Sequence, residues 1–107
     1  NILSAKGAVN FEDLLKIPLI VRWPGQVPAN HESDALQNLV DLAPTFLSFC
    51  DLPVPGLMQG VNQSEVWRSQ KPSVRENTIV EFRHQPTKVH LRTLVTQTHK
   101  LTIYRDR

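Results

Sequence analysis

The run Ile17–Trp23 is the feature that most constrains how this chain can fold. It reads Ile-Pro-Leu-Ile-Val-Arg-Trp, stays apolar until Arg22, and is closed by Pro24 and Gly25. A continuously apolar run with β-branched residues is typical of a strand that is buried on both faces of an α/β sheet. Such a strand needs neighbours on both sides, and the rest of the sequence supplies few. The run therefore predicts further sheet sequence upstream of residue 1.

The composition narrows the class of protein. The chain has 107 residues, 40% of them hydrophobic and 21% charged, which suits one globular domain or a piece of one. Twelve basic against ten acidic residues give a net charge of +2, and the basic residues are scattered. Neither a nucleic-acid surface nor an apolar run of the roughly 18 residues that a membrane helix needs is indicated. The single cysteine excludes an internal disulfide, and the localisation stays open.

Two short helices are expected before and after the centre of the chain. Asn10 is expected to cap a helix over residues 11–16, because its side chain is a good acceptor for free N–H groups at a helix start. A second short helix is expected over residues 62–69. Its apolar contacts would be Val66 and Trp67.

A longer amphipathic helix is expected to begin at Asp41, which suits the N-cap position. Leu42, Phe46 and Cys50 recur at a spacing of four residues and would form its apolar face, and Pro53 ends it. Cys50 is therefore expected in the core, as a small hydrophobic residue and not as a nucleophile.

The last third of the chain is rich in β-structure. Three segments alternate apolar and polar side chains and predict an antiparallel meander: residues 78–82, 89–96 and 100–104. Opposite charges across this sheet predict an ion pair between Glu81 and Arg92. The chain thus divides near residue 75, into an α/β part over residues 1–75 and an antiparallel part over residues 76–107.

Candidate site residues are few. The phosphate loop, the G-x-G-x-x-G turn, the H-E-x-x-H zinc motif and the nucleophile elbow are all absent from the sequence. His84 and His90 flank the polar connection 85–88, which would border a pocket or be an ordinary surface loop. No third ligand has a spacing that supports a metal site there. Lys6, next to Gly7, would either bind an anion or simply be solvated.

Several motifs, in their order and spacing, resemble those of a known family: Lys6-Gly7, Glu12, Ile17–Gly25, Val40–Thr45, Leu52-Pro53, Gly60 and the tail 91–104. Together they are similar to the C-terminal half of a sulfatase, in the alkaline phosphatase superfamily. The resemblance covers nearly the whole chain. It departs from the family pattern at Asp51, where glycine is frequent, and at His99, where tyrosine or tryptophan is frequent.

The resemblance implies both a fold and a function. The fold is the C-terminal part of a sulfatase-like α/β domain, followed by a small, truncated antiparallel subdomain. Sulfatases hydrolyse sulfate esters with a formylglycine made in a C/S-x-P/A-x-R motif, which this chain lacks because Cys50 is followed by Asp-Leu-Pro. The nucleophile and the ligands of a divalent cation, usually calcium, would lie upstream. The fragment is therefore expected to be inactive alone.

Three residues acquire expected roles from the resemblance. Lys6 matches the family's active-site lysine, which contacts the sulfate group. An ammonium group suits that role, because negative charge shifts toward the leaving oxygen in the transition state. His84 and His90 become candidates for the rim of the substrate cleft, although ordinary loop residues remain the alternative.

Two other interpretations stay open. The first is a fragment of a phosphonate or phosphate ester hydrolase of the same superfamily, because those enzymes share the strand with the P-L-I pattern. The second is a non-catalytic interaction module whose exposed sheet edge pairs with another chain. The same exposed edge makes self-association of the fragment an expectation.

Overall fold

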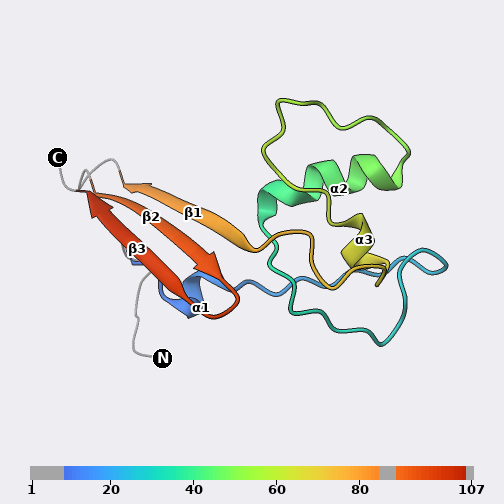
Figure 1. Ribbon diagram of the computed structural model, residues 1–107, viewed down its shortest axis with the longest axis horizontal. Helices are drawn as coiled ribbons and strands as arrows, with labels where there is room; N and C mark the ends of the chain where they lie inside the picture. Colours follow the sequence, from blue (N-terminus) through green and yellow to red (C-terminus); the bar gives the residue numbers. More distant parts are fainter. Residues whose placement is uncertain (1–8, 85–88, 106–107) are drawn as a thin grey trace. The chain divides into compact units, whose positions relative to one another are not determined.

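The computed structural model describes residues 9–84 and 89–105. The chain divides into two compact units (Figure 1). The sheet unit comprises residues 1–19 and 79–107, and the helical unit comprises residues 20–78. Within the described ranges, no helix has the length and apolar character needed to cross a membrane.

Three consecutive strands form the sheet: β1 (Asn77–His84), β2 (Val89–Thr96) and β3 (Lys100–Arg105). They lie in the order β1-β2-β3 (Figure 1), which confirms the predicted meander. The β2–β3 pair is antiparallel, with Thr93 opposite Thr102. Alternation of side chains along each strand explains why these segments were recognisable from their sequence.

One face of the sheet carries the small core of its unit. Leu91 and Thr93 of β2 are fully buried on this face. The Thr93 hydroxyl interacts with the Thr102 hydroxyl at 2.9 Å and accepts a hydrogen bond from the buried side chain of Asn10. Lys100 of β3 forms an ion pair with Glu12 at 3.1 Å. Hydrogen bonds and an ion pair thus hold the N-terminal segment of this unit on β2 and β3.

The predicted N-cap of the first helix is wrong. Helix α1 spans Glu12–Leu15, and its N-cap residue is Phe11, which makes no side-chain capping bond. Asn10 is 8% exposed and donates to Thr93 instead. A buried amide needs a partner in the interior, and the buried hydroxyl supplies it. A non-local contact therefore overrides the local capping preference.

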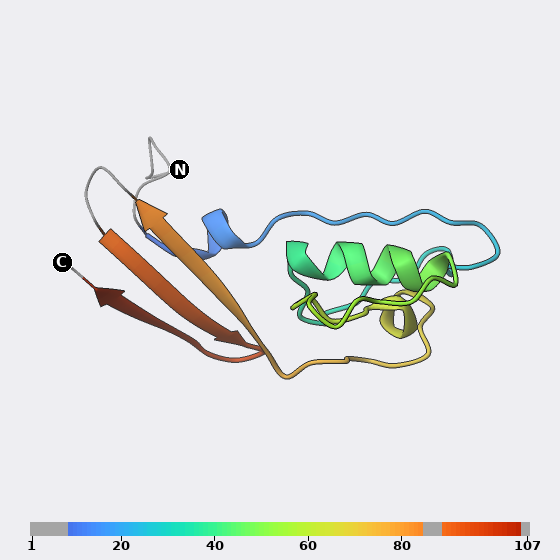
Figure 2. The ribbon, with the colours of Figure 1, turned by 90° about the horizontal axis from the view of Figure 1, so that it is seen from above.

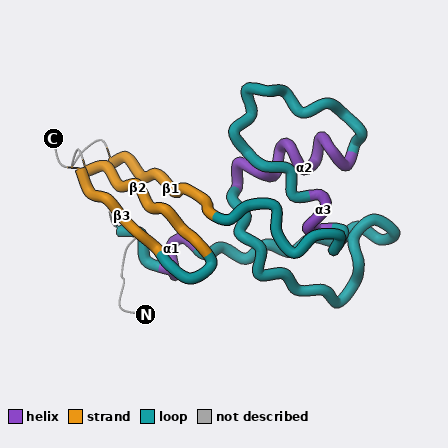
Figure 3. The backbone as a smooth tube through the Cα atoms, viewed as in Figure 1, coloured by secondary structure: helices purple, strands orange, loops and turns teal. Residues whose placement is uncertain are grey.

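The helical unit consists mostly of loop, with a few short helices (Figure 3). Its helices are the 3₁₀-helix η1 (Leu39–Asp41), α2 (Leu42–Phe49) and α3 (Ser64–Trp67). Figure 2 shows α3 beside α2, in agreement with their contacts. Phe49, Val66 and Trp67 form the core, and the Phe49 ring lies 5.8 Å from that of Trp67. The predicted apolar contacts of the second short helix are confirmed.

The predicted apolar face of the longer helix is only partly correct, because Leu42 packs against the aromatic core whereas Phe46 and Cys50 are exposed. Cys50 is exposed and Phe46 is 52% exposed, whereas Pro44, Thr45 and Phe49 are buried. The buried face is therefore rotated toward Thr45 and Phe49, because Thr45 bonds to buried backbone and Phe49 joins the aromatic core. Cys50 lies beyond the last helical residue, where no core packs on it. The expectation of a core thiol is corrected accordingly.

Helix α2 ends in a Schellman motif. The Leu52 N–H donates to the Leu47 carbonyl at 2.9 Å, and the Asp51 N–H donates to the Ser48 carbonyl at 3.2 Å. This closure requires a left-handed residue, and Asp51 has a φ of 53°. Asp51 thus occupies a conformation that favours glycine.

The predicted buried strand over residues 17–23 is not present. This segment has no strand assignment, and Ile17 is 55% exposed and Ile20 91% exposed. In the described ranges the only sheet is the consecutive three-stranded one, so the segment has no strand to pair with. Its last residue, Trp23, packs on Phe49 with ring centroids 4.9 Å apart. The α/β sheet of the predicted fold class is thus not formed by the described residues.

Candidate functional site

The three residues expected to carry function contribute little to the described structure. Lys6 lies outside the described residues. His84 is the last residue of β1, and its side chain is likewise outside the described part of the structure. His90 is half-buried near the start of β2, opposite Arg105 of β3. The roles of all three remain predictions.

The predicted cross-strand ion pair is confirmed. Arg92 Nε lies 2.9 Å from Glu81 Oε1, and Arg83 Nη2 lies 2.8 Å from the same oxygen. The Arg83 guanidinium and then that of Arg92 lower the pKa of Glu81. All three side chains are more than a third exposed, so solvent screens the charges and the cluster contributes little to stability.

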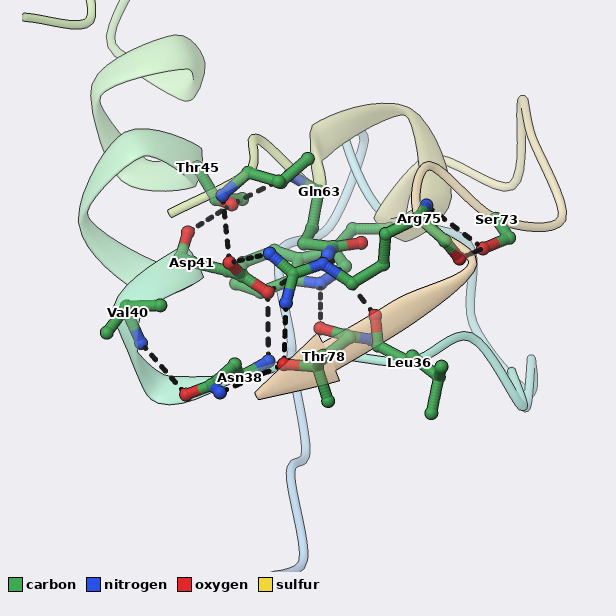
Figure 4. Close-up of polar contacts among 12 residues, drawn as sticks. Leu36, Asn38, Val40, Asp41, Thr45, Gln63, Ser73, Arg75 and Thr78 are labelled. Atoms are coloured by element: carbon green, nitrogen blue, oxygen red, sulfur yellow. Dashed lines mark hydrogen bonds and ion pairs between the residues drawn. The ribbon is translucent and has the colours of Figure 1, made fainter. Parts of the chain in front are cut away.

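A buried carboxylate is the best-defined polar centre of the described chain. Asp41 is 1% exposed. Its Oδ1 accepts hydrogen bonds from Val61 N at 2.8 Å and Arg75 Nη2 at 2.7 Å, and its Oδ2 accepts from Asn38 N at 2.9 Å and Gln63 Nε2 at 3.1 Å (Figure 4). We call these residues, together with Thr45 and Thr78, the Asp41 cluster. Four donors saturate the carboxylate.

The local sequence explains part of this placement. Asn38 and Asp41 form a capping box at the start of η1, in which each side chain bonds to the backbone of the other end. Asp41 was expected to cap α2 with its side chain, and that prediction is wrong because the carboxylate turns back to Asn38 N. The spacing Asn-x-x-Asp is the sequence signal that could have predicted this capping box. The contacts of Asp41 with Gln63 and Arg75 have no such signal, because these partners are too distant in the sequence.

The cluster continues through two hydroxyls. Thr45 Oγ1 donates to the Asp41 carbonyl at 2.6 Å and accepts from Gln63 N at 2.9 Å. Thr78 Oγ1 accepts from Arg75 Nη1 at 2.8 Å. Figure 4 shows these side chains converging from η1, α2, the loop before α3 and the first residues of β1. The cluster therefore fastens four separate stretches of the helical unit to one another.

Gly60 allows the loop before α3 to approach Asp41. A Cβ atom at this position would lie 1.9 Å from the Val40 carbonyl oxygen and 3.0 Å from Asp41 Cα. Only glycine fits such a close backbone approach. The next residue, Val61, then directs its N–H at the carboxylate.

The Asp41 cluster has a structural role. The side chains of Arg75 and Asp41 are only 11% and 2% exposed, and the carboxylate's acceptor positions are filled. A saturated, inaccessible carboxylate does not transfer protons to a substrate. The Oε1 of Gln63 and the Nε of Arg75 are buried and have no hydrogen-bond partner among the described residues, so the cluster includes one unused acceptor and one unused donor there.

A divalent cation does not fit the described side chains. No group of three or more His, Cys, Asp or Glu residues comes together in the ranges 9–84 and 89–105. We therefore derive no metal-dependent step from the residues of this structure.

Comparison with known proteins identifies the relatives of the chain. The family model described as "N-sulphoglucosamine sulphohydrolase, C-terminal" matches residues 7–107. The N-acetylglucosamine-6-O-sulfatase of Bacteroides thetaiotaomicron is 37% identical over 60 residues, which are 56% of this chain and 11% of that protein. Arylsulfatase G of Rattus norvegicus is 40% identical over 53 residues, which are 48% of this chain and 10% of that protein.

A third relative extends the comparison to another bacterium. The uncharacterised sulfatase YidJ of Escherichia coli is 34% identical over 61 residues, covering 56% of this chain and 12% of that protein. The matched part of the chain thus spans about a tenth of the length of these curated relatives. No solved structure matches the chain significantly.

Proposed function

The chain belongs to the sulfatase family, and we propose that it forms the C-terminal portion of a sulfuric ester hydrolase and is inactive alone. The match of residues 7–107 to the C-terminal family model carries this proposal. In its finer form, residues 1–75 are the trailing segment of the catalytic α/β domain. Residues 76–107 belong to an antiparallel C-terminal subdomain.

The proposed catalytic contribution of the chain is Lys6. Its ammonium group would contact the sulfate group of the substrate ester. During hydrolysis the bond between sulfur and the leaving oxygen breaks, and negative charge develops on that oxygen. A fixed cation stabilises this charge more in the transition state than in the ground state, which accelerates the reaction. The place of Lys6 in the family pattern supports this role.

The exposed run 17–23 supports the proposed place in a larger α/β domain. Ile17, Leu19 and Ile20 are 55%, 47% and 91% exposed, although they are among the most apolar side chains of the chain. An extended apolar run of this kind gains burial when strands pair on both sides of it. We propose that strands of the remaining catalytic domain supply that pairing.

The rim of the substrate cleft is the proposed place of His84 and His90. Both bound the connection between β1 and β2, and imidazoles can donate or accept hydrogen bonds with an oxygen-rich ester. The nucleophile and the calcium ligands would come from residues of the longer polypeptide. When bound, the cation would help to neutralise the sulfate oxygens.

An activity comparison tests the proposal. The 107-residue chain and the longer polypeptide that contains it are each incubated with an aryl sulfate, and released sulfate is measured. We expect release by the longer polypeptide only. Release by the 107-residue chain alone would overturn the claim that the remaining machinery lies elsewhere. Preference of the longer polypeptide for a phosphate ester would overturn the sulfatase assignment.

A further inference from the structure

An open groove lies in the helical unit, away from the Asp41 cluster. It has a volume of about 680 Å³, is largely open to solvent, and is lined by the loop Pro24–Ala29 on one side and by Arg68 and Gln70 on the other. This volume lies in the range of small-molecule sites.

The loop wall of the groove is held by backbone hydrogen bonds. Gln26 N and Val27 N both donate to the Trp23 carbonyl, at 3.1 and 2.9 Å. Gly25 supplies the left-handed conformation of this turn, with a φ of 81°. Trp23 itself is anchored on Phe49. This wall is therefore preformed, which lowers the entropic cost of binding.

Arg68 is held on the opposite wall with most of its donors unused. Its guanidinium carbon lies 4.5 Å above the centre of the Phe49 ring, and Nη2 donates to Gln26 Oε1 at 3.3 Å. The other guanidinium N–H groups have no partner among the described residues. A stacked guanidinium keeps its orientation and can bind an oxyanion through two parallel hydrogen bonds.

The electrostatics of the groove favour an anion. Arg68 is the only charged side chain among the described residues that line it. The nearest acid on α3, Glu65, is paired with Lys71 at 2.8 Å. Arg68 therefore keeps its full charge toward the groove. The amide groups of Gln26 and Gln70 add neutral donors and acceptors that suit hydroxyl groups.

We propose that this groove binds a sulfated mono- or disaccharide, with Arg68 on the sulfate group and Gln26 and Gln70 on the sugar hydroxyls. The choice of a sulfate ester rests on the proposed sulfatase function, whereas the anion part rests on Arg68 and the saccharide part on the amides of Gln26 and Gln70. Lys6 is not among the described residues that line the groove, and the groove would hold a sulfated unit without taking part in hydrolysis.

A titration of the 107-residue chain, followed by two-dimensional NMR, tests the proposal. The probes are glucose-6-sulfate, glucose and sodium sulfate at constant ionic strength. Charge-assisted hydrogen bonds predict that glucose-6-sulfate binds at least about tenfold more tightly than glucose. R68Q, which keeps a planar amide over Phe49, should reduce this affinity to within about twofold of that for glucose. R22Q removes an exposed arginine outside the groove and should leave the affinity unchanged.

Q70A provides a second route, because it removes groove contacts and leaves the Arg68–Phe49 contact intact. It should weaken glucose-6-sulfate while preserving the binding of sulfate. Equal affinity of R68Q and the parent chain, or chemical-shift changes outside residues 23–29 and 68–70, would overturn the site. Sulfate binding as tightly as glucose-6-sulfate would overturn its saccharide part. In the longer polypeptide, a K6A variant that still binds glucose-6-sulfate but no longer releases sulfate from an aryl sulfate separates this site from the proposed function.

Discussion

Arg75 Nη2 lies 2.7 Å from Asp41 Oδ1, and both side chains are almost fully withdrawn from water. The two residues are 34 positions apart in the sequence. This ion pair closes the helical unit, because Asp41 joins η1 to α2 and Arg75 lies two residues before the start of β1. Burial of an ion pair costs desolvation energy, and the four hydrogen bonds to the Asp41 carboxylate offset that cost.

Removal of one partner of this ion pair should lower the free energy of unfolding of the helical unit. D41A leaves the Arg75 guanidinium buried without a counter-charge and is expected to lower the free energy of unfolding by about 3–5 kcal/mol. Urea denaturation followed by tryptophan fluorescence measures this loss. E65A, which breaks the exposed pair with Lys71, is the matched control and should change stability by less than about 1 kcal/mol. Equal losses in the two variants would contradict the assigned importance of Asp41.

Gly60 should not tolerate a side chain. In G60A the added methyl group would overlap the Val40 carbonyl, so the loop must move and the Val61 N–H must leave Asp41. We expect a loss of about 2 kcal/mol or more, in the range of strained or overpacked sites. G56A is the control, because a Cβ at Gly56 meets no atom within 4 Å. Thermal melting of both variants distinguishes a steric effect from a general effect of glycine replacement.

Replacement of Asp51 by glycine should raise the stability of the chain. Its φ of 53° suits glycine better than aspartate, so D51G should stabilise the chain by about 0.5–1 kcal/mol. D51A keeps the Cβ strain and should not stabilise it. Chemical denaturation of both variants gives the comparison. Equal gains from D51G and D51A would show that the lost carboxylate, and not the backbone conformation, is responsible.

The exposed Glu81 cluster should show a weak dependence on pH. Arg83 and Arg92 lower the pKa of Glu81 below its ordinary value of 4.5 in the folded state. Its stabilising contribution is therefore complete above that value and is lost as the pH falls through the lowered pKa. The stability difference between the parent chain and E81Q should be largest near neutral pH and shrink in acid. A difference that grows in acid would contradict the ion pair, and added salt should reduce it.

The sequence predicted the structural features that depend on local patterns of residues. The strands of the meander, the Glu81–Arg92 pair and the burial of Val66 and Trp67 all follow from alternation or short-range spacing, and the structure confirms them. The sulfatase resemblance depended on motif order and was confirmed by the family match.

The failed predictions share a physical cause. Asn10 and Asp41 were both assigned capping roles for the helix that follows. The Asn10 side chain bonds instead to the distant Thr93, and the Asp41 carboxylate turns back to Asn38 N and is held there by the distant Arg75. The strand expected over residues 17–23 requires neighbouring strands, which the described residues do not provide. Capping preference and periodicity describe the segment itself, and they do not contain the partners that decide its final contacts.

Hydrolysis of an aryl sulfate by the longer polypeptide, with Lys6 replaced, tests the central claim most directly. K6A should reduce kcat by about 10²–10³ at nearly unchanged folding, because it removes a charge that acts on the transition state. K16A, at an exposed lysine just after α1, is the matched control and should retain parental activity. Parental activity of K6A would contradict the assignment of Lys6 as the sulfate-contacting residue that this chain contributes.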